Sequence, residues 1–443
     1  MESSSHSKLN LKKFIRGFLI FAMTLISVGG VSLFPLVARY PLILCSGIIT
    51  AGYILFKQKK VFITTPVTLM LLSVAYTFIS VFYSLDKGFT LLIAAVYLCS
   101  ALLLLADYPE NLYESAIKAI KIVCIVIAIS IIMSSFIDNC MLKYFWFIVN
   151  PTHSPSVTTA ITQELRWSVS YSGFAREKGE AAFIMNIGIC TCFAKYFSQR
   201  KFTFSDWVCI LMFFWALLLT SKRMLFICPI ATISIMLLIS KKKGRFQRII
   251  PLVLLAVCGI VVVGANVPDL MRVFERFLDT DSMQTLSGRV YLWPHCFDMF
   301  FKSPLIGMGM GSFNQYLQNI NYTVSGEYWT HHAHNIYYQF LGELGIIGCL
   351  LLWGSLLMIF YKTIQLLRSE QTTDDQKYLL IFSCSLQIIC FIYCASGNVL
   401  LFPQEIYPWF MCLAITTTIS NKLKRQKSNA QFAQPTWGEM QNV

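Results

Sequence analysis

Three of the six histidines in the chain fall within four residues, at His331, His332 and His334. The pattern of apolar residues predicts that a long loop enters a helix at this point, with Asn335 as its N-cap. An imidazole at such an entry can act as a general base or bind phosphate. Glu343 follows nine residues after His334, so we expect both side chains on the same side of the helix entry.

A cluster of three histidines also raises the question of a metal site, and the spacing argues against one. His331 and His332 are adjacent, so their side chains diverge on any regular element, and no H-E-x-x-H spacing is present. Cys190 and Cys192 form a C-x-C pair, but nothing nearby in the sequence completes a zinc set. We therefore expect no metal and no cofactor. A polar interfacial loop without chemistry is the plainer interpretation of the histidines.

Basic side chains occupy two turns that are suited to bind an anion. Thr220–Arg223 is a tight turn between two apolar runs, and Ser287–Arg289 precedes Trp293 in the long loop. An arginine binds phosphate oxygens through two parallel hydrogen bonds. In the alternative interpretation, Lys222 and Arg223 only extend toward lipid headgroups.

A second loop adds two more cations. Arg166 and Arg176 lie in this loop, and Arg176 is followed by Glu177 and Glu180 at the favourable N-terminal end of a predicted helix. Helix capping and surface charge explain this element without any ligand. Together with His334, Arg223 and Arg289, however, either Arg166 or Arg176 would line a cationic cavity on the outer face. Pyrophosphate carried by a membrane lipid is the ligand that such a cavity would suit.

A glycine-rich run separates the Ser287–Arg289 turn from the histidines. Pro304 and three alternating glycines, Gly307, Gly309 and Gly311, predict a tight turn rich in exposed backbone. Because no strand precedes it, the run is no dinucleotide fingerprint. A loop that merely needs flexible residues is the alternative interpretation.

The elements that position these residues must be membrane helices. Of the 443 residues, 56% are hydrophobic and 13% are charged, whereas ordinary soluble domains carry about 25% charged residues. This composition excludes a disordered chain, a coiled coil and an ordinary cytosolic enzyme. Apolar runs of roughly 20 residues are long enough to cross a ~30 Å hydrocarbon core. They predict an all-α integral membrane protein with one domain over residues 1–443 and twelve helices, at 14–34, 40–56, 63–84, 88–106, 116–137, 180–198, 204–220, 224–240, 248–265, 335–361, 378–396 and 405–420.

Positively charged residues indicate the orientation of the chain. An even number of helices puts both termini on one side, and the run Lys241–Lys243 with the basic C-terminal tail places that side in the cytoplasm. The same preference explains the net charge of +14, so no nucleic acid is expected as a partner. Two long loops, 138–179 and 266–334, then lie outside, and the second is expected to form short helices on the outer face.

Four motifs, taken in their order along the chain, give this sequence a resemblance to the O-antigen ligase and O-antigen polymerase superfamily, a group of bacterial integral-membrane glycosyltransferases. The resemblance covers roughly residues 160–400, and each motif by itself is weak while the ordered set is fairly specific. The motifs are T-S-K-R at Thr220–Arg223, S-G-R with the downstream Trp at Ser287–Trp293, S-P-L-I-G-M-G-M-G-S-F at Ser303–Phe313, and H-A-H-N with E-L-G-x-x-G at His332–Asn335 and Glu343–Gly348.

The resemblance implies a bundle similar to the lipid-dependent glycosyltransferases of the GT-C-like class, in the inner membrane, with a periplasmic active site. It implies metal-independent, inverting transfer from an undecaprenyl-pyrophosphate-linked glycan. Arg223 and Arg289 would hold the pyrophosphate, and His334 would orient or deprotonate the acceptor hydroxyl. Lys222 is the alternative to Arg223, because the family often has Ser-Arg followed by a small residue where this chain has Ser-Lys-Arg. The remaining candidate substrate-binding residues are Arg166, Arg176, Trp293, His332, Asn335 and Glu343.

The acceptor divides the superfamily into polymerases and ligases. The segment Ser172–Phe183 resembles an element of polysaccharide polymerases in which Glu-Pro-Gly precedes a helix, although Lys178 replaces the proline. This favours a polymerase, which joins glycan units and would work with a chain-length regulator protein. The alternative is a ligase, whose acceptor is lipid A–core. A lipid-linked polysaccharide flippase and an assembly protein without chemistry are further alternatives, but transporters bind near the membrane midplane, whereas these polar clusters lie in outer loops.

Overall fold

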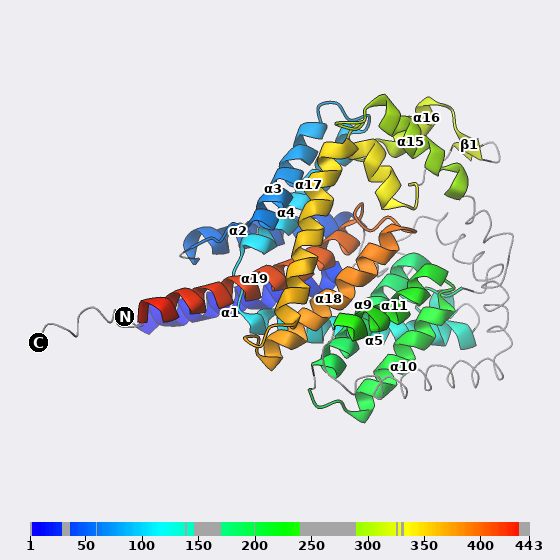
Figure 1. Ribbon diagram of the computed structural model, residues 1–443. Coiled ribbons are helices and arrows are strands. Elements are labelled where there is room, and N and C mark those ends of the chain that lie inside the picture. The colour runs from blue at the N-terminus through cyan, green and yellow to red at the C-terminus, as the bar shows by residue number, and fades with distance from the viewer. Residues whose placement is uncertain are drawn as a thin grey trace, which may run out of the picture.

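Most of the described residues lie in helices (Figure 1). The computed structural model describes residues 2–28, 36–58, 60–137, 140–145, 170–198, 200–239, 289–324, 327–328 and 332–433. Its long helices are α1 (Glu2–Ser27), α2 (Leu36–Phe56), α3 (Thr65–Ser80), α4 (Lys87–Leu105), α5 (Glu110–Phe136), α9 (Lys178–Phe197), α10 (Phe204–Leu219), α11 (Arg223–Ile239), α17 (Ile336–Leu367), α18 (Asp374–Cys394) and α19 (Pro403–Ala433). Its shorter elements are α6 (Cys140–Tyr144), η2 (Arg289–Tyr291), α15 (Trp293–Lys302), α16 (Phe313–Asn319) and the antiparallel strands β1 (Thr323–Val324) and β2 (Glu327–Tyr328).

The helices follow the predicted membrane ranges. A described helix overlaps each range except 248–265, which lies outside the described residues. Five helices, α2, α4, α5, α17 and α18, are long and apolar enough to cross a membrane by length and composition. The described part of the chain is therefore a helical membrane bundle. The short helices α15 and α16 lie in the large loop, as predicted, and the two-residue strands β1 and β2 were not predicted.

Some helices are longer than the apolar runs. Helix α1 begins at Glu2 instead of residue 14, and α19 continues to Ala433 instead of ending near residue 420. The sequence from Trp409 to Ala433 contains neither glycine nor proline, so nothing in it stops a helix after the apolar part has ended. Hydropathy marks the part of a helix that lies in lipid, whereas caps and breakers determine where the helix itself ends.

Side-chain caps start several of these helices. The Asp86 carboxylate accepts a hydrogen bond from Phe89 N at 3.0 Å, at the start of α4. Thr373 and Gln376 form a reciprocal capping box at the start of α18. Each cap satisfies amide groups that the first helical turn leaves without an intrahelical acceptor.

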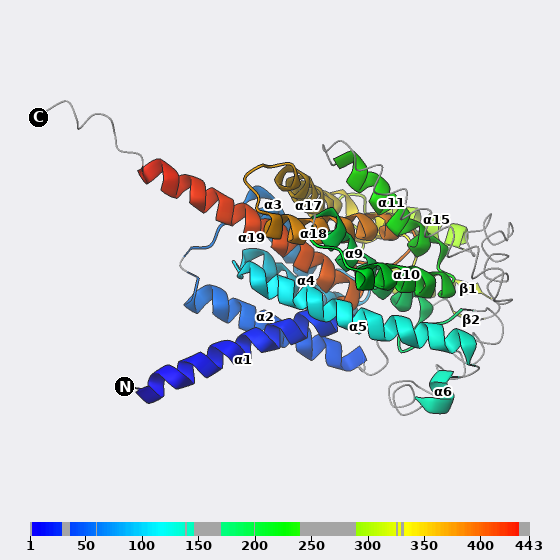
Figure 2. The same cartoon turned by 90° about the horizontal axis from the view of Figure 1, so that it is seen from below.

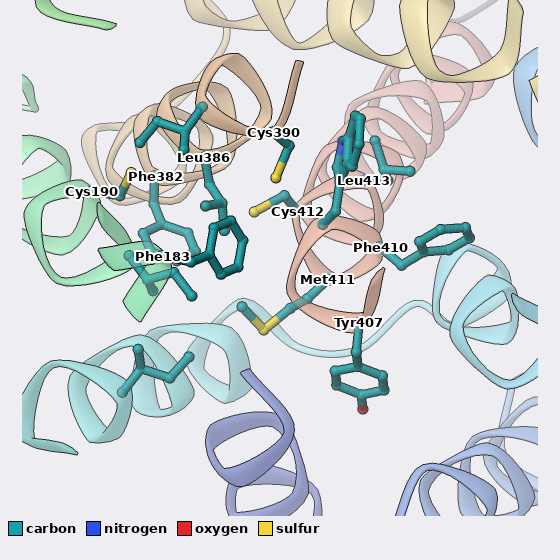
Figure 3. Packing of buried hydrophobic residues seen from close by; sticks show 14 of the residues in the cluster. Phe183, Cys190, Phe382, Leu386, Cys390, Tyr407, Phe410, Met411, Cys412 and Leu413 are labelled. Carbon is teal, nitrogen blue, oxygen red and sulfur yellow. The ribbon is translucent and has the colours of Figure 1, made fainter. Parts of the chain in front are cut away.

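Helix α18 lies inside the bundle, packed against α9, α11, α17 and α19 (Figure 1). Aromatic and sulfur-containing side chains of α9, α18 and α19 meet in its core, where Phe183, Phe382 and Cys412 are buried (Figure 3). Helices α1 and α5 lie side by side on another side of the bundle (Figure 2). This packing fixes the C-terminal end of α18, from which a turn leads into α19.

The end of the bundle where α10 begins is held by a saturated ion cluster. Asp206 accepts hydrogen bonds from Lys121 Nζ at 2.8 Å, from Thr203 N at 2.8 Å and from Thr203 Oγ1 at 2.7 Å. It also pairs with Lys195 of α9. Both carboxylate oxygens of Asp206 therefore have partners, and the cluster joins α5, α9 and α10.

Helix α17 is broken at Gly345, whose φ of 63° and ψ of −169° are not helical. The glycine-rich run fills the break. Four backbone hydrogen bonds join the run to α17, so the amides and carbonyls freed by the break have partners. They run from Met308 N to Gly342 O (3.0 Å), Gly309 N to Glu343 O (2.8 Å), Ile346 N to Pro304 O (2.9 Å) and Ile347 N to Leu305 O (3.1 Å).

We expect Gly307→Ala to destabilise the protein strongly. Gly307 has φ +69°, and a Cβ at this position would collide with the carbonyl group of Glu343 across the break. For alanine the left-handed conformation alone costs about 1–2 kcal/mol, and the collision adds to that cost. Gly354→Ala in α17 is the matched control, because its Cβ would meet only Leu69 Cδ1, at 3.8 Å. Thermal unfolding of both purified variants measures the difference, and equal melting temperatures would contradict the tight fit of the run.

Candidate functional site

His334 lies just before α17 and faces the turn between α18 and α19. Its Nδ1 is 3.3 Å from Nδ2 of Asn398 in that turn. The Oδ1 atom of Asn398 is buried and has no hydrogen-bond partner in the described structure. An asparagine presents either N–H or oxygen to a ring nitrogen after a 180° rotation of its amide, so Asn398 selects which nitrogen of His334 carries the proton.

Arg289 reaches the same turn from the large loop. Its Nη1 donates a hydrogen bond to the Ser396 carbonyl oxygen at 3.0 Å. Burial lowers the pKa of the Arg289 guanidinium from its usual value, while the nearby Tyr393 acts in the opposite direction. A guanidinium that has lost part of its hydration binds an anion more strongly, because less water must be displaced.

The turn Ser396–Asn398 therefore joins two of the three predicted catalytic residues. Arg289 is separated from Ser396 by 107 positions, and His334 is separated from Asn398 by 64. Neither Ser396 nor Asn398 was predicted to take part in the site. The only signal was a short break between two apolar runs, made of small and polar residues, which is typical of any loop.

His332, a predicted substrate-binding residue, packs between two aromatic rings. Its ring centroid lies 5.8 Å from that of Phe89 and 5.6 Å from that of Phe402. Its Nδ1 is 3.3 Å from Gln339 Nε2, which also donates to Glu343 Oε1 at 2.9 Å. His332 thus belongs to a buried hydrogen-bonded chain along the first turns of α17, and it holds the loop that carries His334.

Glu343 ends this chain and holds the glycine-rich run. Its Oε2 accepts a hydrogen bond from Gly311 N at 2.8 Å, and its Oε1 accepts one from Phe313 N at 3.0 Å. The Glu343 side chain is fully buried. Glu343 and His334 were expected on one side of the helix entry, but the described contacts of Glu343 lead to His332 and the glycine run.

We expect Glu343→Gln to lower stability and activity together. An amide group in this position would direct N–H toward the backbone N–H of Gly311 or Phe313 and would lose one acceptor. A buried donor left without a partner costs about 1–3 kcal/mol. Thermal unfolding and transfer activity should both fall. Normal stability with lost activity would instead show that Glu343 acts on the substrate.

Trp293 and Asn335 position the histidine loop. Asn335 caps α17 as predicted, with its Oδ1 accepting from Tyr338 N at 3.2 Å. The indole Nε1 of Trp293 donates to the Ala333 carbonyl oxygen at 3.2 Å, and its ring lies edge-on to Tyr338. Both residues therefore hold the backbone on either side of His334.

The Thr220–Arg223 turn lies against the start of α9. Lys222 Cε is 3.6 Å from the point that a Cβ would occupy at Gly179. Arg223 is the first residue of α11, and α11 packs against α18, the helix that leads to the Ser396–Asn398 turn. The cationic turn is thus linked, through the packing of α11 against α18, to the helix that leads to the Ser396–Asn398 turn.

Two site turns have unusual backbone conformations. Among the described residues other than glycine, only Ser221 (φ 55°), Asn321 (φ 54°) and His334 (φ 55°) have positive φ. This conformation is uncommon for such residues and costs of order 1–3 kcal/mol. Two of the three cases thus fall in the turns that sequence motifs had marked.

The two arginines predicted in the loop 138–179 have different outcomes. Arg176 Nη2 is 3.7 Å from Glu180 Oε1, in an ion pair at the start of α9. Arg166 falls outside the described residues. Within the ranges that the structure describes, no group of three or more His, Cys, Asp or Glu side chains is placed to hold a metal ion.

The arrangement suits anion binding and proton transfer at one turn. Arg289 supplies a partly buried cation, and His334 supplies a titratable ring whose orientation is set by Asn398. Comparison with known proteins gives one family match: residues 207–353 match the family model described as O-antigen ligase. No curated protein matches the chain. The matched segment contains Arg223, Arg289 and His334 and ends before the Ser396–Asn398 turn.

Proposed function

We propose that this chain, which carries an O-antigen ligase domain of the O-antigen ligase and polymerase superfamily over residues 207–353, transfers a glycan from undecaprenyl pyrophosphate to an acceptor hydroxyl. The observation that carries the proposal is the meeting of Arg289 and His334 at the Ser396–Asn398 turn. The reaction would take place at the periplasmic face of the bacterial inner membrane, with both termini in the cytoplasm.

Arg289 and Arg223 would bind the pyrophosphate. The carrier is an activated leaving group, so the enzyme has to stabilise the charge that develops on phosphate oxygens as the glycosidic bond breaks. Arg289 uses one N–H on the Ser396 carbonyl and has further N–H groups for phosphate oxygens. Arg223, at the first residue of α11, would add the second cation, with Lys222 beside it.

His334 would take the proton of the acceptor. The hydroxyl oxygen forms a bond to the anomeric carbon, the bond from that carbon to the phosphate oxygen breaks, and undecaprenyl pyrophosphate leaves with the electron pair. The hydroxyl proton passes to Nε2 of His334. For Nε2 to carry the lone pair, Nδ1–H has to donate to the amide oxygen of Asn398. Direct displacement of this kind inverts the anomeric configuration, and the residues named here need no metal for it.

The start of α9 supports a polymerase. The segment Ser172–Phe183, with its resemblance to a polymerase element, packs against the cationic Thr220–Arg223 turn through Gly179 and Lys222. A glycan whose pyrophosphate is bound at that turn would lie near this segment. The partners would then be a lipid-linked glycan as donor, a second glycan as acceptor and a chain-length regulator protein. The description of the matched family favours the alternative, a ligase that uses lipid A–core as acceptor.

Complementation of a deletion strain tests the proposal. The gene is returned as wild type, His334→Ala, Arg289→Ala or His295→Ala, at equal membrane level, and the surface glycan is separated on a gel. His295 is the matched control, because it is a partly exposed histidine of the same large loop that pairs with Asp298 at 3.2 Å. We expect wild type and His295→Ala to restore the glycan and the other two variants to fail.

The glycan pattern of the deletion strain separates the candidate functions. Single repeats attached to core, extended to a ladder by the wild-type gene, identify a polymerase. Core without glycan, together with accumulated lipid-linked polymer, identifies a ligase. Full activity of both His334→Ala and Arg289→Ala would overturn the proposed site and favour transport or assembly.

A further inference from the structure

Beside the proposed catalytic turn lies a group of charged and amide side chains, buried except for the partly exposed Arg176, from α2, α9 and α19 and from the residues just before α9. We propose that this group is a saccharide-binding site that holds a sugar ring of the glycan by its hydroxyl groups. We call it the α2–α9–α19 cluster, and it consists of Arg39, Arg176, Glu180, Gln404 and Glu405. It rests on the proposed function only in taking the transferred glycan as the source of the sugar.

Glu180 is the centre of the cluster. Its Oε1 accepts from Gln404 Nε2 at 2.8 Å and from Arg39 Nη1 at 3.4 Å, and Arg176 Nη2 lies 3.7 Å away. These contacts bring together residues as far apart as 141 and 224 positions in the sequence. One oxygen atom thus accepts two hydrogen bonds and lies at ion-pair distance from a second guanidinium, with the three partners coming from three parts of the chain.

The cluster contains further hydrogen-bond donors and acceptors that have no partner in the described part of the chain. Arg39 has a side-chain exposure of 2%, and Glu180 has 5%. Six buried atoms of the cluster have no hydrogen-bond partner in the described structure, and leaving one such group unpaired costs about 1–3 kcal/mol. The donors are Arg39 Nε, Arg39 Nη2 and Arg176 Nη1, and the acceptors are Glu180 Oε2, Glu405 Oε2 and Gln404 Oε1.

The ion cluster at the opposite end of the bundle has no such unpaired carboxylate oxygen. Asp206 has a side-chain exposure of 3%, similar to that of Glu180, yet both of its oxygens have partners. The ion cluster around Asp206 therefore needs no ligand to complete the hydrogen bonding of its carboxylate. The α2–α9–α19 cluster also pairs a buried carboxylate with cations, but several of its guanidinium and carboxylate atoms have no hydrogen-bond partner among the described residues.

The balance of open groups indicates the class of ligand. Two arginines face two glutamates, so the cluster has no formal excess of positive charge to attract an oxyanion. Its open atoms include both donors and acceptors, and a hydroxyl group can serve both at once. Nε and Nη2 of Arg39 form a planar fork whose two N–H groups point in parallel, which matches two neighbouring oxygens. Adjacent ring hydroxyls of a sugar meet all of these requirements.

The cluster is connected to the catalytic turn. Gln404 and Glu405 lie in the first turn of α19, which directly follows the turn that contains Asn398. Tyr393 is near enough to Arg289 and to Glu405 to interact with both charges. Glu177 is exposed, the side chain of Arg176 is 21% exposed, and that of Arg39 is 2% exposed, so solvent access decreases from Glu177 to Arg39. A sugar next to the reacting one would therefore reach the cluster from the outer rim.

Binding to the purified full-length protein tests the site without requiring catalysis. The probe is the free oligosaccharide released by mild acid from the surface polysaccharide of the producing cell, and inorganic pyrophosphate is the comparison ligand. Saturation-transfer NMR detects contact, and titration gives the affinity. Arg39→Lys keeps the charge but removes the fork, Glu405→Gln keeps the shape, and Arg200→Lys alters an arginine bound by Glu114 and Asp375 elsewhere.

We expect wild type and Arg200→Lys to bind the oligosaccharide equally and Arg39→Lys and Glu405→Gln to bind it at least tenfold more weakly, with melting temperatures near that of wild type. Binding of pyrophosphate should be unaffected by Arg39→Lys. Oligosaccharide affinity independent of Arg39, absence of oligosaccharide binding, or Arg39-dependent binding of pyrophosphate alone would each overturn the saccharide site. If Arg39→Lys does not fold, Glu405→Gln and Gln404→Leu decide in its place.

Failure of the site and failure of the proposed function have different signatures. If the Arg39→Lys variant transfers glycan as fast as wild type, the protein has the proposed function but not the saccharide site. If wild type binds the oligosaccharide and Arg39→Lys does not, but the wild-type gene fails to restore surface glycan in the deletion strain, the protein has the saccharide site but not the proposed function.

Discussion

An Arg289→Lys protein should fold, reach the membrane and transfer glycan at least about 100-fold more slowly than wild type. Lysine keeps the positive charge but cannot donate to the Ser396 carbonyl and to a phosphate oxygen through one planar group. Loss of a preorganised donor to a developing oxyanion typically costs a factor of about 10²–10³ in rate. Single-turnover transfer from a lipid-linked donor, in membranes with equal amounts of protein, measures the effect.

Arg368→Lys is the control for this substitution. Arg368 also donates from its guanidinium to a backbone carbonyl, that of Ile239 at 3.1 Å, but it lies just after the end of α17, away from the His334 end. We expect it to retain nearly all activity. An Arg289→Lys enzyme with wild-type rate would show that a positive charge alone is sufficient and that simultaneous hydrogen bonds to Ser396 and to phosphate have no role.

Asn398 variants should reveal how His334 acts. We expect Asn398→Leu to lose about 10²-fold or more in rate, because the ring then loses the contact with the Asn398 amide that would set its tautomer. Asn398→Asp should retain activity within about tenfold, since a carboxylate accepts from Nδ1–H and leaves the lone pair on Nε2, as a general base requires. A carboxylate next to the ring also stabilises the protonated imidazolium, so the acidic limb of the pH–rate profile should move to higher pH.

The comparison of the two Asn398 variants is decisive because their sizes are similar and their hydrogen bonding differs. If Asn398→Asp abolishes transfer as completely as His334→Ala does, then Asn398 must donate to Nδ1. His334 would in that case act through Nε2–H as a hydrogen-bond donor and take no proton. Equal rates for wild type, Asn398→Asp and Asn398→Leu would remove Asn398 from the mechanism.

Much of this fold could be predicted because its signals are local. An apolar run long enough to cross lipid predicts a helix wherever the run occurs, and the Asn335 cap needs only an acceptor three residues before the bonded amide. Local signals also made His334 and Arg289 candidate site residues, because both are polar residues in a loop between apolar runs. Membrane-spanning helices separate apolar from polar residues so strongly that the remaining polar clusters are conspicuous.

Long-range contacts could not be predicted in this way. Asn398 and Ser396 look like ordinary loop residues, and their role exists only through partners 64 and 107 positions away. Glu343 was predicted to bind substrate because of its distance from His334 along a regular helix. The break at Gly345 lets the glycine-rich run approach, and the amides of that run now occupy both Glu343 oxygens.

The broken helix α17 also constrains how the chain is assembled. A helix that enters lipid with unpaired amides and carbonyls is penalised by several kcal/mol for each group. The partners of Ile346 and Ile347 are the carbonyls of Pro304 and Leu305, which leave the ribosome about forty residues earlier. That earlier segment has to wait at the membrane surface until α17 arrives. The loop and the second half of the bundle therefore mature as one unit, and neither is exchangeable without the other.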